Sequence, residues 1–229
     1  MTLQAPELAT PARVNIYFRI HKALRSMLSD TLVRVGRLDA ADAEQRAEVL
    51  GQVRQLADFC LGHLQHENEF VHTAMEARQP GSSSVACDDH THHVHACQHL
   101  SMLADQAATE PSPANLHTLY LYLSVFVGDN LLHMNMEETE HNAVLWACYT
   151  DAELIAIEQA IVAALSPEES WLSMRWMVPA LSPAERLELL SKVRAAAPSP
   201  VFAGLIAGLQ PYLAAADWSK LSDGLRLAA

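Results

Sequence analysis

Apolar residues recur at helical spacing along nearly the whole chain, and in each of the four longest helical segments a potential metal ligand interrupts the apolar stripe. Period-two alternation, which marks half-buried strands, is almost absent. We expect the four helices at residues 14–35, 43–77, 88–108 and from the break at 110–113 to 148. Because short breaks join them, successive helices should run antiparallel. The sequence therefore predicts an all-α chain whose first part is an up-and-down four-helix bundle.

The chain beyond residue 150 has a different pattern, with shorter helical segments separated by proline. We expect helices at residues 151–165, 167–177, 183–197 and 199–213. Two of them begin with an N-cap serine, a proline at the first position and an acidic first turn, at Ser166 and Ser182. We therefore predict two domains: a bundle over residues 12–150, and a helical extension over 151–229 that packs on the bundle or on a second subunit, the latter giving a homodimer.

The charge balance excludes one large class of partner. The formal net charge is -12 and the sequence pI is about 5.4, without the clusters of Lys and Arg that neutralise phosphates. Residues 1–11 lack a signal-peptide pattern, and no apolar run approaches the ~20 residues of a membrane span. We expect no nucleic-acid partner, no membrane association and a cytoplasmic location.

Six residues on the inner stripes carry the chemistry. They are His21, His63, Glu67, His93, His133 and Glu137. Each His-x-x-x-Glu pair places an imidazole and a carboxylate one turn apart on the same helix face. Buried carboxylates require compensating positive charge, and no Lys or Arg lies on these stripes. Four imidazoles and two carboxylates suit iron, manganese or zinc better than magnesium or calcium, so we predict a metal site.

The third helix leaves its ligand ambiguous, because residues 88–99 contain five histidines and two aspartates. His93 shares a helix face with Leu100 and Leu103 and is the preferred ligand. His92, or His95 together with His99, remain alternatives.

The other ionisable residues near the stripes have less defined roles. Asp89, one turn before His93, and Glu140, three residues after Glu137, are additional candidate ligands. Several histidines lie off the inner stripes, and we expect them to be solvated or to contact ligands from outside. These are His66, His72, His90, His92, His117 and His141.

The ordered series of His, His-x-x-x-Glu, His and His-x-x-x-Glu resembles the hemerythrin-like (HHE cation-binding) domain family over residues 14–144. The resemblance implies a non-haem centre of two iron ions (Fe2+/Fe3+), with manganese or zinc as alternatives. In it, Glu67 and Glu137 would bridge the metals. His21 and His63 would bind one metal, and His93 and His133 the other.

The resemblance also implies a function: binding or sensing dioxygen or another small diatomic ligand, in response to redox state, nitric oxide or iron. Asp89 departs from the invertebrate oxygen carriers, which have a second histidine at that place. The last carboxylate, Glu137, is glutamate as in bacterial relatives. Outside the metal site, the sequence contains no nucleophile or acid–base constellation, so a binding or sensing protein is favoured over an enzyme. Three alternatives stay open: a metal-stabilised interaction or regulatory module, a metal-free bundle, and a di-iron oxidase or peroxidase-like enzyme.

Overall fold

The computed structural model describes residues 13–227, in which all regular secondary structure is helical. This confirms the predicted all-α class. The four long helices are α1 (Phe18–Gly36), α2 (Ala43–His66), α4 (Ser84–Thr109) and α5 (Pro113–Met136). Two π-helical turns, η1 (Glu67–His72) and η2 (Glu137–His141), extend α2 and α5 into the short helices α3 (Thr73–Arg78) and α6 (Asn142–Cys148).

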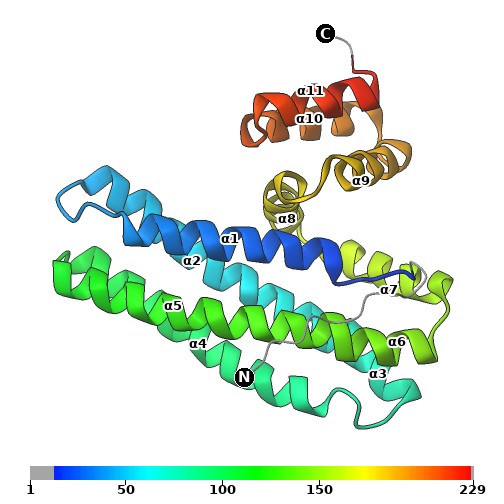
Figure 1. Cartoon of the computed structure of the whole chain (residues 1–229), viewed down its shortest axis with the longest axis horizontal. Coiled ribbons are helices and arrows are strands. Elements are labelled where there is room, and N and C mark those ends of the chain that lie inside the picture. The colour runs from blue at the N-terminus through cyan, green and yellow to red at the C-terminus, as the bar shows by residue number, and fades with distance from the viewer. Residues whose placement is uncertain (1–12, 228–229) are drawn as a thin grey trace, which may run out of the picture.

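The four long helices surround one apolar core. Helix α1 packs against α2 and α5, and α4 packs against the same two helices from the other side (Figure 1). In Figure 1 the α1–α2 and α4–α5 connections lie at the left end, and the α3–α4 connection lies at the right end. Leu28, Leu56, Leu100 and Leu119 are fully buried between the helices, and burying each such side chain contributes about 1.5–3 kcal/mol. Within residues 13–227, none of the helices combines the length and apolar character needed to cross a bilayer.

Local hydrogen bonds explain where the helices begin. Asp42 and Ser112 cap α2 and α5 by accepting from the backbone N–H three residues later. Helix α4 begins four residues before the expected start, because the Glu76 carboxylate accepts hydrogen bonds from the N–H groups of Gly81 and Ser83 and closes the preceding loop. Gly81 adopts a φ of 85°, the left-handed conformation that favours glycine.

The extension contains five further α-helices and a short 3-10 turn in the described part of the chain. They are α7 (Asp151–Ala164), α8 (Pro167–Ala180), α9 (Pro183–Ala196), α10 (Ser199–Leu209), η3 (Gln210–Tyr212) and α11 (Ala215–Leu225). Ser166 and Ser182 form the predicted caps, each as a complete capping box with the glutamate three residues later. Helix α11 was not expected from the sequence, because it begins without a side-chain cap.

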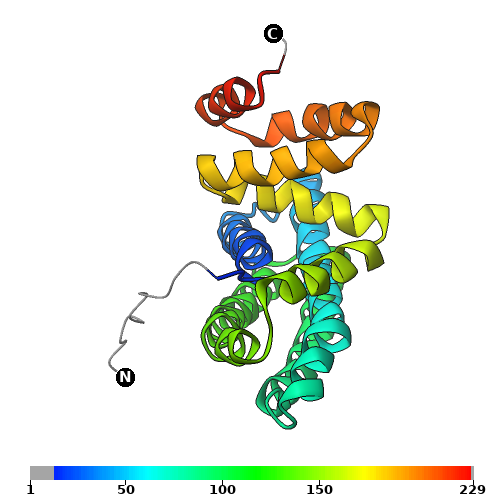
Figure 2. The same ribbon diagram turned by 90° about the vertical axis from the view of Figure 1, so that its right-hand side faces the viewer.

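The extension packs on the bundle through α8. Leu172, Trp176 and Met177 of α8 pack against the bundle core, and α8 contacts α1. Figure 2 shows α8 to α11 on the side of α1 that faces away from α4 and α5. An ion pair of 2.7 Å between Lys22 and Glu185 joins α1 to α9. The domain boundary at residue 151 stays a prediction, since Leu154 of α7 lies in one apolar cluster with residues of the bundle.

The outer helices have their own apolar cluster, held in place by a buried arginine. Arg186 of α9 is 2% exposed and donates hydrogen bonds to the carbonyls of Val178 and Leu181, at 2.8 and 2.9 Å. These carbonyls belong to the last turn and C-cap of α8, where helix geometry leaves acceptors unpaired. The guanidinium also lies 3.3 Å from Asp217 of α11, so one side chain connects three helices.

Candidate metal centre

A buried polar layer separates the main bundle core from the smaller apolar cluster around Tyr17, Val71 and Leu145. Glu67, the first residue of η1, lies at its middle and is 3% exposed. Its Oε1 atom is 3.1 Å from His63 Nε2 and 3.6 Å from His21 Nε2, and its Oε2 atom is 3.6 Å from His90 Nε2.

Glu137, the first residue of η2, is fully buried and shares two of these histidines, His21 and His90, with Glu67. Its Oε2 atom is 3.5 Å from His21 Nε2. Its Oε1 atom is 3.3 Å from His133 Nε2 and 3.6 Å from His90 Nε2. Each carboxylate therefore faces histidines from both sides of the layer, one side with each oxygen.

The four imidazoles form two close pairs. The Nε2 atoms of His21 and His63 are 3.2 Å apart, and those of His90 and His133 are 3.0 Å apart. Two ligands bound at right angles, each about 2.1 Å from a metal, lie about 3 Å from each other. The spacing thus fits one cation per pair. The side chains of each group have ligand atoms within 4.8 Å of one another: His21, His63, Glu67 and Glu137 in the first, Glu67, His90, His133 and Glu137 in the second.

The charge of the layer also favours cations. All four oxygens of Glu67 and Glu137 are buried and have no hydrogen-bond partner. Burial raises the pKa of Glu67, but the charges of His63 and His21 lower it more, so its pKa lies well below 4.5. For Glu137, burial and the charge of Glu67 raise the pKa. Close contacts with His133 and His90 and the charge of His133 lower it by more, so the pKa of Glu137 also lies below 4.5. Two ionised carboxylates are costly in a core unless positive charge neutralises them, which protonated histidines supply here and bound metal ions would supply in their place.

Polar residues behind the histidines orient the rings. The Nδ1 atom of His21 lies 3.0 Å from Glu138 Oε1, which also pairs with Arg25, and the Nδ1 atom of His90 lies 2.8 Å from Asn68 Oδ1. Each contact leaves Nε2 to face the carboxylates, as metal-binding histidines require. In the metal-free chain, burial lowers the pKa of His21, but Glu138 and Glu67 raise it to about 9.

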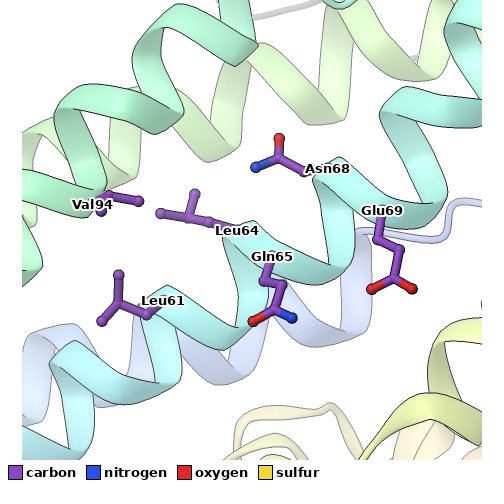
Figure 3. A pocket seen from close by; sticks show the side chains of 6 residues that line it. All are labelled: Leu61, Leu64, Gln65, Asn68, Glu69 and Val94. Atoms are coloured by element: carbon purple, nitrogen blue, oxygen red, sulfur yellow. The ribbon is translucent and has the colours of Figure 1, made fainter.

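A surface hollow between α2 and α4 adjoins this layer. Asn68 contributes to its wall and, in Figure 3, points to the opposite side of its helix from Gln65 and Glu69. The other side chains lining the hollow are Leu61, Leu64 and Val94. Because Asn68 also contacts His90, the hollow approaches the second histidine pair.

The structure groups a different histidine of the third helix with the carboxylates than the preferred His93. His90, which we expected to be solvated or to contact ligands from outside, is 2% exposed and belongs to the second group. His93 lies in neither group; its ring stands 4.6 Å from that of His133, and its Nδ1 atom is buried without a partner. The alternatives His92, His95 and His99 are exposed. His90 and His93 differ by about one turn of α4, so the axial position of α4 decides between them.

The two additional candidates lie outside both groups. Glu140 is exposed. Asp89 is half-exposed, with its Oδ2 atom 3.7 Å from His133 Nδ1, which places it behind that ring. Of the remaining histidines, His92 and His117 are exposed as expected.

Two histidines that we expected to lie off the inner stripes are buried beside the carboxylates. His72, the last residue of η1, and His141, the last residue of η2, form a third group with Glu137. In a π-helical turn the backbone bonds to the residue five positions away, so Glu67 and His72 share a face. The α-helical period does not predict this position for His72, because it places residues five apart on different faces. His141, four residues after Glu137, lies on the same face as Glu137 by that period.

Comparison with known protein families, with curated proteins and with solved structures finds no match to this chain. The buried histidines and glutamates are arranged as a group that could hold metal ions.

Proposed function

We propose that this chain is a hemerythrin-like protein that holds two iron ions between its long helices and uses them to bind or sense dioxygen or a related small oxidant. In this proposal His21 and His63 hold one iron, His90 and His133 hold the other, and the two glutamates lie between them. The observation that carries the proposal is that Glu67 and Glu137 each face both histidine pairs with all four oxygens lacking hydrogen-bond donors.

The chain's own residues would prepare the site in three ways. Glu138 and Asn68 hold the rings of His21 and His90 with Nε2 toward the carboxylates. The apolar clusters on both sides limit the access of water. Two histidines and two shared carboxylates per metal leave positions open for an external ligand. When bound, an iron pair supplies the electrons that reduce an oxidant.

The first test is the metal content of the full chain, purified without added metal and after reconstitution with ferrous iron. We expect about two irons per chain, with a near-ultraviolet absorption band that appears in air and is lost after dithionite. Glu67→Ala and Glu137→Ala should each lose most of the metal, because each removes a carboxylate facing both histidine pairs. Glu140→Ala, on the same π-helical turn as Glu137 but exposed, is the matched control.

Two results would contradict the proposal at different levels. A reconstituted chain without metal would defeat the metal centre itself. Two tightly bound zinc ions that iron cannot displace would keep a metal centre and defeat its redox role.

A further inference from the structure

His72 and His141 are buried next to the proposed metal centre without being needed for it. They are 5% and 3% exposed, and their rings lie edge to face with centroids 5.3 Å apart. The ring of His72 also stacks on that of His90 at 4.7 Å. Two buried imidazoles in contact with the site, but outside both groups of four, require a separate explanation.

The spacing of this third group fits a hydrogen-bonded ligand better than a metal. One atom each from His72, His141 and Glu137 lie within 4.8 Å of one another, but neither imidazole has a nitrogen within 4.0 Å of a carboxylate oxygen in the described part of the chain. The nitrogen–oxygen distances in the two groups of four are 3.1 to 3.6 Å, so the third group is more widely spaced. A small guest in this wider space would be held by hydrogen bonds of about 2.8 Å. Metal–ligand bonds are about 2.1 Å long, so an imidazole and a carboxylate more than 4.0 Å apart could share a metal only from nearly opposite sides of it.

The hydrogen bonds of His72 and His141 show which of their ring nitrogens have no partner. The hydroxyl of Tyr17, which is 2% exposed, lies 3.1 Å from His141 Nδ1. Within residues 13–227, Nδ1 is the only hydrogen-bond partner of this hydroxyl, so we assign the hydroxyl as the donor and place the proton of the neutral His141 ring on Nε2. The Nε2 atom of His72 is buried and has no partner. Each ring thus has a nitrogen available for a guest molecule.

We propose that His72 and His141, with Tyr17 fixing the latter, form a subsite that donates hydrogen bonds to a small anion bound at the metal centre. The ligand would be a small anion whose terminal atoms accept hydrogen bonds. Hydroperoxide, which forms from dioxygen, is one such anion. This inference rests on the proposed function and extends it, since an apolar pocket would favour neutral dioxygen, whereas two donors stabilise a charged ligand.

Azide binding to the iron-loaded full chain tests the subsite. The visible absorption band of the azide complex and calorimetry both measure the dissociation constant. His72→Leu and His141→Leu should each raise the azide dissociation constant about ten-fold, because each removes one hydrogen bond to a charged ligand. Tyr17→Phe removes only a hydroxyl and should raise it about three-fold through the orientation of His141. His93→Leu, a buried histidine beside His133 but outside the third group, should leave it unchanged.

Metal content measured on the same samples separates this inference from the proposed function. Two irons per chain in every variant, together with weakened azide binding, would support the subsite. Unchanged azide affinity in Tyr17→Phe and both leucine variants, or a wild-type chain that holds two irons without binding azide, would overturn it. Loss of one iron in the leucine variants would also overturn it, since the histidines would then be ligands. A wild-type chain without iron would instead defeat the proposed function.

Discussion

At the scale of single residues, the candidate centre depends on which atom of each side chain faces the middle of the bundle. Glu67 and Glu137 are buried acceptors without donors, and four Nε2 atoms surround them at 3.1 to 3.6 Å. Contacts on the Nδ1 side set the orientation of the rings, as for Glu138 behind His21. The spacing of ligands along the sequence does not predict such outer contacts, but they have measurable effects on metal affinity.

The first residue-scale prediction distinguishes His90 from His93. Replacing His90 by Ala removes an imidazole that faces both carboxylates, so we expect about one metal less per chain. His93→Ala should keep both metals, because His93 belongs to neither group. Metal content after reconstitution and desalting measures both variants. The reverse result would restore the ligand that the helical period of the sequence favoured.

The second concerns Glu138, whose carboxylate lies 3.0 Å from His21 Nδ1 and also pairs with Arg25. Glu138→Gln removes the charge that orients this ring, and we expect the metal affinity to fall about 10- to 100-fold. Competition with a chromophoric chelator measures it. Glu140→Gln, two residues further along and exposed, is the control. Equal affinities in the two variants would show that Glu138 does not position His21.

At the scale of helices and turns, the two π-helical segments are the features that shape the site. Both begin with a glutamate of the centre and end with a histidine of the third group. A π turn inserts about one extra residue into the helix, which turns the following side chains toward the bundle interior. The loop before α4 closes on Glu76, and α4 begins four residues before the start expected for that helix.

The loop before α4 leads to a prediction of pH dependence. The backbone N–H groups of Gly81 and Ser83 and the Ser83 hydroxyl lower the pKa of Glu76 from 4.5 to about 2. A lowered folded-state pKa means that the carboxylate stabilises the fold above pH 4.5 and that this contribution is lost as the pH falls toward 2. Glu76→Gln should therefore reduce the free energy of unfolding at pH 7, with a gap to wild type that narrows below pH 4.5.

Urea unfolding of the metal-free chain between pH 7 and pH 3 measures this gap. Glu110→Gln, an exposed glutamate at the end of α4, is the control and should show no gap. A gap that stays constant down to pH 3 would mean that the Glu76 charge does not hold the loop.

A second element-scale prediction concerns the end of α8. Arg186→Met keeps most of the side-chain volume but leaves the carbonyls of Val178 and Leu181 without donors, so we expect a loss of about 2–4 kcal/mol in the free energy of unfolding. Arg54→Met, which breaks an exposed ion pair with Asp105, should cost less than about 1 kcal/mol. Denaturant unfolding compares the two. Similar losses would show that Arg186 does not act through the α8 carbonyls.

At the scale of the whole molecule, the candidate centre connects all four long helices, and α8 covers α1, the helix that carries His21. Metal binding would therefore act on the stability of the whole fold, because an ion that binds only the folded state stabilises it. Leu172, Trp176 and Met177 extend the bundle core into the extension, so the two parts share buried contacts.

Removing the metal measures this coupling. A ligand at 100 times its dissociation constant stabilises by about 2.7 kcal/mol, and about 1 kcal/mol shifts the midpoint of a chain of this size by roughly 2–4 °C. We thus expect chelation to lower the thermal midpoint by at least about 5 °C. A variant with both Glu67→Ala and Glu137→Ala should show no such shift. Identical midpoints for loaded and chelated wild type would contradict metal binding in the core.

The sequence by itself determined the features that depend on neighbours along the chain. Helical period and capping residues are local, so the all-α class, the Ser166 and Ser182 caps and the inward position of Glu67 and Glu137 could be predicted. Only the tertiary structure decided the features that depend on how helices align. The axial position of α4 placed His90 rather than His93 beside the carboxylates, and the π turn η1 brought His72 into the layer. The physical reason is that side-chain packing across the bundle fixes these shifts of about one turn, and the period of a single helix carries no information about them.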